Sequence, residues 1–338
     1  MSNRVFPGFN LILILVLASR NLSYSQNHSH PDGRSSALFI YYPPTKSTLL
    51  IDGYTEYPDS TVNDVWSWNG KVWRKIPGSG PGPRSLSAGA FDKRRERIVV
   101  YGGIDKGGYE TGKRDDAWLF NGKAWSKLEV NKVGTRDHHE MVYDESLNAF
   151  IMYGGLNNKR EYDSTTWILR NNQFTPCPCS GPGARYHFAM AYDRRRKRVV
   201  LYGGGKPELR NEIWEFDGKN WQHVQPSDTA GPGPRIWNSL VYSDDLKMVV
   251  VHGGLAPKNE DTWGWNGKDW TKIATGGPIG KLIALGYDPK RKTILAYGGS
   301  DSEGLVTSAL WELYAGKWKK ISDNGKWKWD GQKYTRTN

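Results

Sequence analysis

The chain has 338 residues, a net charge of +12 at pH 7, 39 Gly, 18 Pro, 16 Trp, 18 Tyr and only two Cys. Two cysteines are too few for a disulfide framework, and the composition suits strands joined by tight turns rather than long helices. The sequence contains no phosphate loop, dinucleotide fingerprint, metalloprotease motif or nucleophile elbow, so it favours none of the enzyme classes that these motifs mark.

The first 25 residues are typical of a cleaved export signal. Arg4 supplies a positive charge, and Leu11 to Ala18 is an apolar core too short to cross a bilayer as a helix. Ser23 and Ser25 place small residues three and one positions before a cut ahead of Gln26. We expect the mature protein to be secreted, periplasmic or at the cell surface, with an uncleaved anchor as the alternative.

Gly-Gly pairs recur along the rest of the chain and mark an internal repeat. Each pair closes an apolar run such as Arg97 to Tyr101 or Arg198 to Tyr202, and such runs predict β-strands. The second glycines stand 45 to 52 residues apart when the degenerate Asp52-Gly53 counts as the first copy. The six closing glycines are Gly53, Gly103, Gly155, Gly204, Gly254 and Gly299.

Each repeat also contains a tryptophan that is followed seven residues later by a second aromatic residue. Four of the six copies carry Asn-Gly or Asp-Gly between the two, and these residues tolerate the positive φ angles of a two-residue turn. Each pair therefore predicts a hairpin. The pairs are Trp66 with Trp73, Trp118 with Trp125, Trp167 with Phe174, Trp214 with Trp221, Trp263 with Trp270, and Trp311 with Trp318.

An arginine followed seven residues later by an aromatic residue precedes the Gly-Gly run in five copies. These are Arg34, Arg84, Arg136, Arg185 and Arg235, with Gly280 in the sixth copy. Each repeat then predicts four antiparallel strands: the first from the arginine to the aromatic residue, the second ending at Gly-Gly, and an outer hairpin around the Trp pair.

With these landmarks, residues 34–321 resemble the kelch-repeat family, including the propeller domain of galactose oxidase-like proteins. The resemblance implies an all-β, six-bladed kelch-type β-propeller with four antiparallel strands per blade. One sheet of this composition cannot bury both faces, so the blades are expected to stack around an axis and close. An open solenoid, the alternative, would leave its end blades uncapped. The chain departs from the pattern at Asp52, His252 and Gly280.

The tail after Ile321 repeats the spacing of an outer hairpin from Trp327 to Tyr334, without two preceding strands. We expect an extra C-terminal β-hairpin against the first or last blade, or a half-built seventh blade. The predicted segments are a signal peptide (1–25), a short flexible mature N-terminus (26–33), the propeller (34–321) and a hairpin tail (322–338). The predicted blades span about 34–77, 84–128, 136–176, 185–224, 235–273 and 280–321.

Strand order places the connections from fourth to first strand and from second to third strand on one face, which we call the top. These loops are the longer ones, and binding residues tend to lie on loops that a rigid scaffold holds. The sequence predicts ligand-binding residues around the top of the central channel. The candidates are Arg34, Arg84, Arg136, Arg185, Arg235, Lys281 and Trp237.

Two roles are open for the repeated arginines. They could bind carbonyls or a carboxylate of the neighbouring blade, or form a cationic mouth for a carboxylate, sulfate or phosphate. Two positions after the arginine, the side chain varies between copies, which indicates an asymmetric pocket. The candidate catalytic residues, if catalysis occurs, are His138, His187, Glu161 and Glu208.

No cofactor and no metal site are predicted. Cys177 and Cys179 would form exposed free thiols or a local bridge, and two ligands do not complete a zinc site. A copper site like that of galactose oxidase needs a cysteine beside a channel tyrosine, which these positions do not offer. Much of the positive charge lies in predicted bottom turns such as Lys93 to Arg97, which favours solvated turns over an anionic partner.

The sequence favours an exported, non-catalytic binding module that presents its top face to a glycan or protein ligand, with anionic ligands included. Nucleic acid is not expected as a partner, and no membrane span is expected in the mature chain. The alternative, which the resemblance to exported six-bladed kelch proteins implies, is an isomerase of the sialic acid mutarotase type. In that case an arginine would hold the carboxylate of an acidic sugar while a histidine or glutamate moved a proton.

Overall fold

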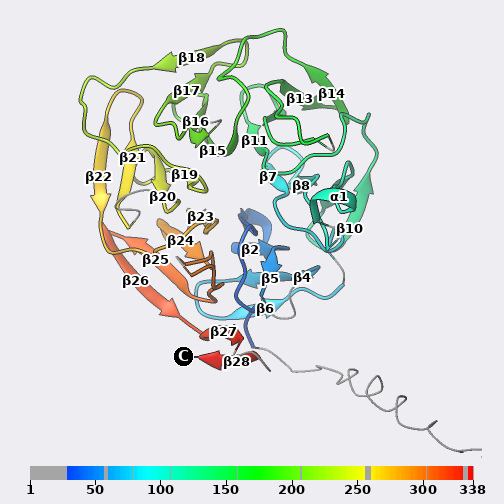
Figure 1. The fold of residues 1–338 in the computed structure, drawn as a ribbon, viewed down its shortest axis with the longest axis vertical. Helices are drawn as coiled ribbons and strands as arrows, with labels where there is room; N and C mark the ends of the chain where they lie inside the picture. The colour runs from blue at the N-terminus through cyan, green and yellow to red at the C-terminus, as the bar shows by residue number, and fades with distance from the viewer. Residues whose placement is uncertain are drawn as a thin grey trace, which may run out of the picture.

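In a computed structural model the chain forms a ring of six four-stranded antiparallel sheets (Figure 1). The structure describes residues 29–56, 60–78, 80–106, 108–157, 159–205, 208–255, 260–301, 303–329 and 334–337. The predicted fold class is confirmed: each sheet is one blade, built from four strands in sequence order. The predicted signal peptide lies outside the described residues.

The first three blades run in order around the ring. Blade one contains β1 (Leu38–Tyr42), β2 (Ser47–Ile51), β5 (Val65–Trp68) and β6 (Trp73–Lys75). Blade two contains β7 (Ala88–Asp92), β8 (Arg97–Tyr101), β9 (Ala117–Phe120) and β10 (Trp125–Leu128). Blade three contains β11 (Glu140–Asp144), β12 (Ala149–Tyr153), β13 (Thr166–Arg170) and β14 (Gln173–Pro176).

The remaining blades repeat this plan. Blade four contains β15 (Tyr186–Asp193), β16 (Arg198–Gly205), β17 (Ile213–Phe216) and β18 (Trp221–Val224). Blade five contains β19 (Ser239–Ser243), β20 (Met248–His252), β21 (Thr262–Trp265) and β22 (Trp270–Ala274). Blade six contains β23 (Ala284–Asp288), β24 (Thr293–Tyr297), β25 (Leu310–Tyr314) and β26 (Lys317–Ser322).

Minor elements lie in the loops between the second and third strands and in the turns. They are η1 (Pro43–Thr45), the two-stranded pair β3 (Tyr54–Thr55) and β4 (Ser60–Thr61), and the one-turn helix α1 (Gly108–Thr111). No helix in the described part of the chain is long and apolar enough to cross a membrane.

Most innermost strands begin later than the sequence predicts. β7 begins at Ala88, four residues after Arg84, and β11 begins at Glu140, four residues after Arg136. The reason is local, because the residue two positions after each repeated arginine has a positive φ, which interrupts regular strand pairing. β15 begins before this residue, at Tyr186, but its pairing with β16 skips His187. The segment from the arginine to the strand is therefore a bend at the top of the channel.

The hydrophobic core lies between neighbouring blades. One cluster joins Val99 and Tyr101 of blade two to Met141 and Phe150 of blade three, and these side chains are at most 3% exposed. Burial of an aliphatic or aromatic side chain of this kind contributes roughly 1.5–3 kcal/mol. Stacking of blades thus buries the faces that a single sheet would expose.

The second glycine of a Gly-Gly pair connects neighbouring blades at several joints. The amide of Gly103 donates to the carbonyl of Arg136 at 2.9 Å, and the amide of Gly204 donates to the carbonyl of Arg235 at 2.8 Å. Gly102, at φ +66, lies so close to the same joint that a Cβ atom would be 2.6 Å from the Arg136 carbonyl oxygen. Positive φ and close backbone approach together require glycine here.

The aromatic residue before Gly-Gly also bonds to the next blade. The hydroxyl of Tyr101 donates to Gly134 and that of Tyr153 donates to Gly183, both at 3.0 Å. In blade five His252 replaces the tyrosine, and its Nε2 lies 2.8 Å from the carbonyl of Pro278. Because a carbonyl only accepts, Nε2 carries the proton, and burial lowers the pKa of His252 to about 4. The substitution therefore keeps the bond between blades.

The ring closes without a strand shared between blade six and blade one. The amide of Gly299 donates to the carbonyl of Arg34 at 2.9 Å, as at the other joints. The hydroxyl of Tyr297 donates to Pro31 at 2.9 Å and to Asp32 at 3.1 Å. Residues 31 and 32, predicted as part of a flexible terminus, are thus held against blade six.

The predicted C-terminal hairpin is present as a separate two-stranded sheet, β27 (Lys326–Trp329) with β28 (Tyr334–Thr337). It lies outside the ring, beside the end of β26 (Figure 1). It joins neither neighbouring sheet, so it does not extend a blade.

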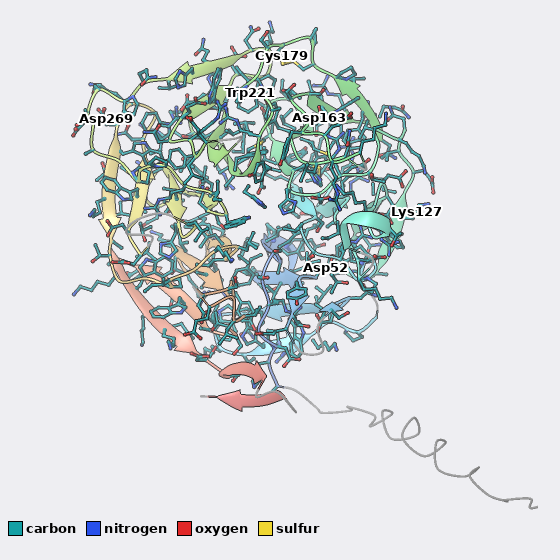
Figure 2. All side chains as sticks on the ribbon, in the orientation of Figure 1. Asp52, Lys127, Asp163, Cys179, Trp221 and Asp269 are labelled. Carbon is teal, nitrogen blue, oxygen red and sulfur yellow. A yellow bond between two sulfur atoms is a disulfide. The ribbon has the colours of Figure 1, made fainter. Side chains whose placement is uncertain are left out.

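Cys177 and Cys179 follow β14 at the outer rim, where Figure 2 labels Cys179. Their sulfur atoms are bonded and their Cα atoms are 5.2 Å apart. Of the two forms that the sequence left open, the structure contains the local bridge.

Candidate functional site

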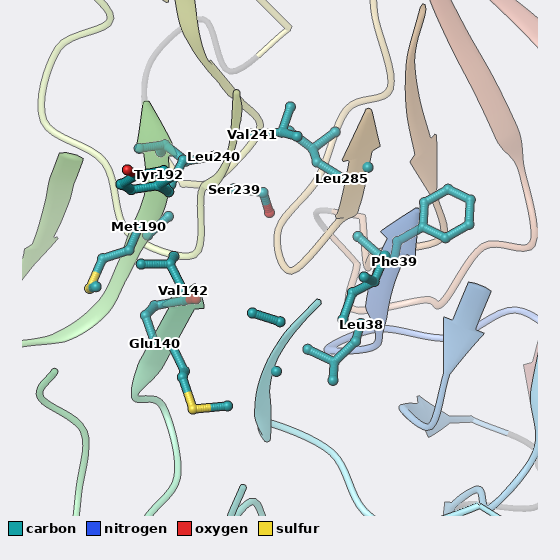
Figure 3. Close-up of a pocket in the computed structure, with 18 of the residues that line it drawn as sticks. Leu38, Phe39, Glu140, Val142, Met190, Tyr192, Ser239, Leu240, Val241 and Leu285 are labelled. Carbon is teal, nitrogen blue, oxygen red and sulfur yellow. The ribbon is translucent and has the colours of Figure 1, made fainter. Parts of the chain in front are cut away.

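The centre of the ring stays open when all side chains are drawn (Figure 2). The channel there has a volume of about 680 Å³ and is lined by the innermost strands of all six blades. Figure 3 shows part of this wall, including Leu38, Val142, Leu240 and Leu285. The middle of the channel is therefore largely apolar, and its two ends differ in chemistry.

Six residues surround the top end of the channel, one from each blade, and we call them the mouth ring. All six line the channel, all are half-buried, and all have φ between 54° and 58°. The mouth ring consists of Ser36, Leu86, His138, His187, Trp237 and Leu282. This left-handed conformation is uncommon for such residues, and here the repeated bend imposes it.

Three backbone hydrogen bonds join neighbouring mouth-ring residues. The amide of Trp237 donates to His187 at 2.9 Å, that of Leu282 donates to Trp237 at 3.0 Å, and that of Ser36 donates to Leu282 at 3.2 Å. The last of these bonds joins blade one to blade six. The mouth has a nearly symmetrical backbone that carries different side chains.

Three neighbouring mouth-ring residues form an aromatic arc. The ring centroids of His138 and His187 are 4.2 Å apart, and those of His187 and Trp237 are 4.7 Å apart. The Lys281 ammonium lies 4.9 Å from the Trp237 ring centroid. The other half of the ring has Leu86, Leu282 and Ser36. An aromatic wall therefore faces an apolar wall across the top of the channel.

His138 is held from behind by a buried carboxylate. Its Nδ1 is hydrogen-bonded to Asp137, and Asp137 also pairs with the Lys113 ammonium at 2.6 Å. Burial alone would raise the pKa of Asp137, but the His138 hydrogen bond and the Lys113 charge bring it below its usual value. The carboxylate thus stays ionised and fixes the orientation of the His138 ring, as in a base positioned by a carboxylate.

His187 lies next to His138 and is kept neutral. Burial, followed by the charges of His138 and Lys281, lowers the pKa of His187 to about 2. Tyr186 contacts its ring at a centroid distance of 4.6 Å and stacks on Tyr162 at 4.9 Å. His187 can therefore exchange neutral hydrogen bonds with a ligand but cannot supply positive charge at physiological pH.

Glu140, below His138, lines the channel as the first residue of β11 (Figure 3). Its side chain has no hydrogen bond or ion pair with the described residues. Burial raises the pKa of Glu140 to about 8. An isolated carboxyl group thus stands in a largely apolar part of the wall, where the equivalent positions of the other blades hold small or apolar side chains.

The five predicted arginines do not line the channel. Arg185 is 0% exposed, its Nη2 lies 2.9 Å from Glu212, and its Nη1 donates to the Gly203 carbonyl at 3.2 Å. Arg84 likewise bonds Asp116 and the Gly102 carbonyl, both at 3.0 Å. Arg34, Arg136 and Arg235 have equivalent contacts to the first residue of the Gly-Gly pair.

These contacts favour the structural role that the sequence left open for the arginines. The partners belong to the arginine's own blade rather than to the next one, which differs from the predicted contact. Each guanidinium connects the bend before the first strand to the end of the second strand and the start of the third. Because the charges are already engaged, they do not form a cationic mouth.

The other predicted site residues divide into two groups. His138, His187 and Trp237 meet in the aromatic arc, and Lys281 joins them from outside the channel lining. Glu161 and Glu208 are exposed and do not line the channel, and Glu161 accepts a hydrogen bond from the Asn157 side chain at 2.9 Å. The structure therefore does not bring these glutamates to the histidines.

Sequence reasoning missed Glu140, Asp137 and Lys113. Glu140 had a signal: the position four residues after the repeated arginine holds Leu38, Ala88, Ala189, Ser239 and Ala284 in the other copies. A carboxyl group among small and apolar residues departs from the repeat. Lys113 had no such signal, because its contact with Asp137 joins loops of two blades. In the described residues, no group of three or more His, Cys, Asp or Glu could hold a metal ion.

No family model matches this sequence, and no curated protein matches it either. Among solved structures, that of YjhT is similar, with a TM-score of 0.66 and 15% sequence identity. The match covers 87% of this chain and 99% of that one. At this identity the likeness concerns the fold, and it supports a kelch-like propeller.

Proposed function

We propose that this protein is a binding module that takes a small acidic glycan ligand at the mouth ring. The observation that carries the proposal is the arc of His138, His187 and Trp237 beside Lys281, at the open top of the channel. A sugar ring has apolar C–H faces that pack on an aromatic ring, while its hydroxyl groups need hydrogen-bond partners. Trp237 supplies the first, and the ring nitrogens of His138 and His187 supply the second.

Lys281 gives the preference for an acidic ligand. Its ammonium lies over Trp237, is half-buried, and pairs with no carboxylate of the described residues. An ammonium at this place adds a charge-assisted hydrogen bond to a ligand carboxylate. Since the five arginines are engaged inside the blades, Lys281 is the cation that we assign to ligand recognition.

The test measures binding of acidic and neutral monosaccharides by calorimetry at low and moderate salt. We expect Trp237→Ala to weaken binding of both kinds about tenfold or more, because it removes the stacking surface. Lys281→Met is expected to remove the preference for acidic sugars and its salt dependence. The control is Lys127→Met, which makes the same charge change at the outer rim (Figure 2). Equal binding by wild type, Trp237→Ala and Lys281→Met would contradict the proposal.

A second candidate function is proton transfer on an acidic sugar, as in a mutarotase. The observation that favours it is the pair of Asp137 and His138, with His187 in ring contact. If Nδ1 of His138 donates to the carboxylate, Nε2 is the basic nitrogen. It can take the proton of the anomeric hydroxyl and deliver the same proton to the ring oxygen as the carbon–oxygen bond of the ring breaks, so that the sugar ring opens, and the reverse transfer closes it on either face.

Proton NMR of freshly dissolved sialic acid tests this candidate. We expect wild-type protein to speed the exchange between anomers and His138→Ala to lose about a hundredfold of that rate or more. His223→Ala, at an exposed position on β18, is the matched control. Anomer exchange at the uncatalysed rate with wild-type protein would dispose of the enzyme and leave the binding module.

A further inference from the structure

We propose that the channel below the mouth ring is a separate subsite for a protonated amine, with the Glu140 carboxylate as its counter-ion. This site goes beyond the proposed function, since it needs neither an acidic ligand nor the aromatic arc. It rests on the position of the Glu140 carboxyl group in the channel, on its neighbours there, and on the lack of a cationic partner among the described residues.

Glu140 faces the channel. It begins β11, pairs across the sheet with Tyr153, and belongs to the channel lining (Figure 3). Its side chain is half-buried, and because β11 is the innermost strand of its blade, the remaining surface is turned to the channel. The carboxyl group is thus within reach of a small molecule in a space of about 680 Å³.

No cation of the described protein neutralises Glu140. Burial is the sole cause of its raised pKa, and no charged side chain contributes to it. Above it, burial lowers the pKa of His139 to about 3, so that this buried neighbour is neutral, as is His187. The charged residues at the lower end bind one another: Lys93 pairs with Glu145 at 2.9 Å and Arg194 with Asp244 at 2.9 Å.

An unpaired carboxyl group in an apolar wall disfavours its ionised form, and the protein gains no internal bond from it. Structures place such groups at ligand sites more often than at random. A ligand ammonium would complete the site, because it restores the ionised carboxylate and forms a short charge-assisted hydrogen bond away from bulk water. One carboxylate with apolar neighbours suits an ammonium better than a metal ion, which needs more ligands.

The lower half of the channel suits the body of such an amine. Each innermost strand carries an aromatic residue toward this end, and all six line the channel. They are Tyr41, Phe91, Tyr143, Tyr192, Tyr242 and Tyr287. Three of them, Tyr41, Phe91 and Tyr192, are half-buried and keep surface for a ligand, whereas the other three are buried between blades. Aromatic faces accept both apolar groups and organic cations. We therefore assign the subsite to a small aryl- or alkylammonium compound rather than to a polar cation.

Ammonium binding is linked to proton release. Glu140 is neutral when the channel holds no cation at neutral pH, and an ammonium beside it favours the carboxylate. Binding at pH 7 is thus expected to release a proton, which a neutral ligand of the same shape would not do.

The experiment is calorimetric titration with benzylamine and with benzyl alcohol at pH 7, in two buffers that differ in ionisation enthalpy. We expect benzylamine to bind wild-type protein with a buffer-dependent enthalpy that reports proton release. Glu140→Gln is expected to weaken benzylamine binding about tenfold or more and to abolish the buffer dependence. Glu129→Gln, the same change at an exposed position after β10, is the control and should bind as wild type does.

Three results would overturn the subsite: no benzylamine binding, equal binding by Glu140→Gln, or benzyl alcohol binding as tightly as benzylamine. Urea unfolding of Glu140→Gln verifies that the variant is folded. Trp237→Ala and Lys281→Met are expected to retain benzylamine binding, because neither side chain contacts Glu140 in the described structure. Failure of the acidic glycan site and failure of the amine site are therefore distinguishable.

Discussion

Arg136 and His138 are two residues apart on the same bend, yet they differ in every property that bears on function. The Arg136 side chain is 5% exposed and pairs with Asp163 at 2.9 Å inside its blade. His138 lines the channel and contacts His187 of the next blade. The same two positions recur around the ring. The first holds a buried arginine in five copies, whereas the second, the mouth-ring position, holds Ser, Leu, His or Trp.

The difference teaches how a repeat separates stability from recognition. Where the structure needs the same contact at most joints, the residue is the same in five of six copies, as for the arginines and the Gly-Gly pairs. In the mouth ring, backbone atoms make the hydrogen bonds between neighbouring blades. The side chain is not needed for this contact and can vary. Variable positions on a constant backbone are therefore the better guide to the ligand site.

The largest expected effect is the loss of a buried arginine. Arg185→Ala leaves the Gly203 carbonyl without this donor and breaks the buried ion pair with Glu212, which keeps its bonds to Arg210 and Trp214. We expect it to lower the free energy of unfolding by about 3–5 kcal/mol. His187→Ala, on the same bend, is expected to cost about 1 kcal/mol. Urea unfolding measures both, with the exposed Arg195→Ala as the control for lost charge. Similar losses of unfolding free energy for Arg185→Ala and His187→Ala would contradict the separation of a structural position from a variable one.

The Gly-Gly joints come next. Gly203→Ala would place a Cβ atom 2.6 Å from the Arg235 carbonyl oxygen, at φ +75. We expect a loss of about 2–4 kcal/mol, from the left-handed backbone and the clash together. Gly183→Ala has φ +81 and no atom within 4 Å of its Cβ, so only the backbone cost of about 1 kcal/mol is expected. Thermal unfolding of the two variants should separate them, and equal melting temperatures would count against the steric role of the joint.

Glu140 gives a pH-dependent test. Its pKa rises from 4.5 to about 8 on folding, so between these values the native state holds a proton that the unfolded state has lost. Its contribution to stability is present below pH 4.5 and is lost as the pH rises toward 8, at up to about 1.4 kcal/mol per pH unit. From pH 6 to pH 7, wild-type protein should lose stability relative to Glu140→Gln by about that amount. Parallel pH profiles of the two proteins would show that Glu140 titrates normally.

The smallest effect is expected in the apolar half of the mouth ring. Leu86 has φ 54, and asparagine adopts this conformation more readily than leucine does. Leu86→Asn should therefore change the free energy of unfolding by about 1 kcal/mol or less, since the lost apolar contact and the relieved backbone oppose each other. If chemical denaturation showed that Leu86→Asn lowers the free energy of unfolding by about 3 kcal/mol, Leu86 would contribute to stability as a core residue does.

The fold was predictable from the sequence because its determinants are local and repeated six times. Glycines with positive φ, hairpin turns between paired aromatics, and apolar runs each act within a few residues, and their spacing gives the number of blades. The first residue of each inner strand was not predictable, because it depends on a left-handed conformation that residues such as Leu86 and Leu282 do not favour. At Leu282 that conformation is accompanied by a hydrogen bond to the neighbouring blade, from its amide to the Trp237 carbonyl, which the sequence does not show.

The candidate site was predictable in part. His138, His187 and Trp237 were predicted from the variation two positions after the repeated arginine, and Lys281 as a substitute for the arginine that the sixth copy lacks. The structure brings the four side chains together. The role of the arginines did not follow, because a repeated cation near a channel has the same pattern whether its charge is buried or presented. Whether an arginine is buried against a carboxylate such as Glu212 or Asp116 depends on the path of the loop between the second and third strands. The spacing of the repeat does not determine that path.

The closure between blades six and one has a consequence for the origin of the molecule. Since every sheet is drawn from one unbroken stretch of chain and the last joint resembles the others, duplication or deletion of one stretch of about 50 residues adds or removes a whole sheet without leaving an orphaned strand. The ring could then gain or lose one blade while the other joints kept their amide-to-carbonyl hydrogen bonds. The bore would change its diameter, and with it the size of the molecule that it admits.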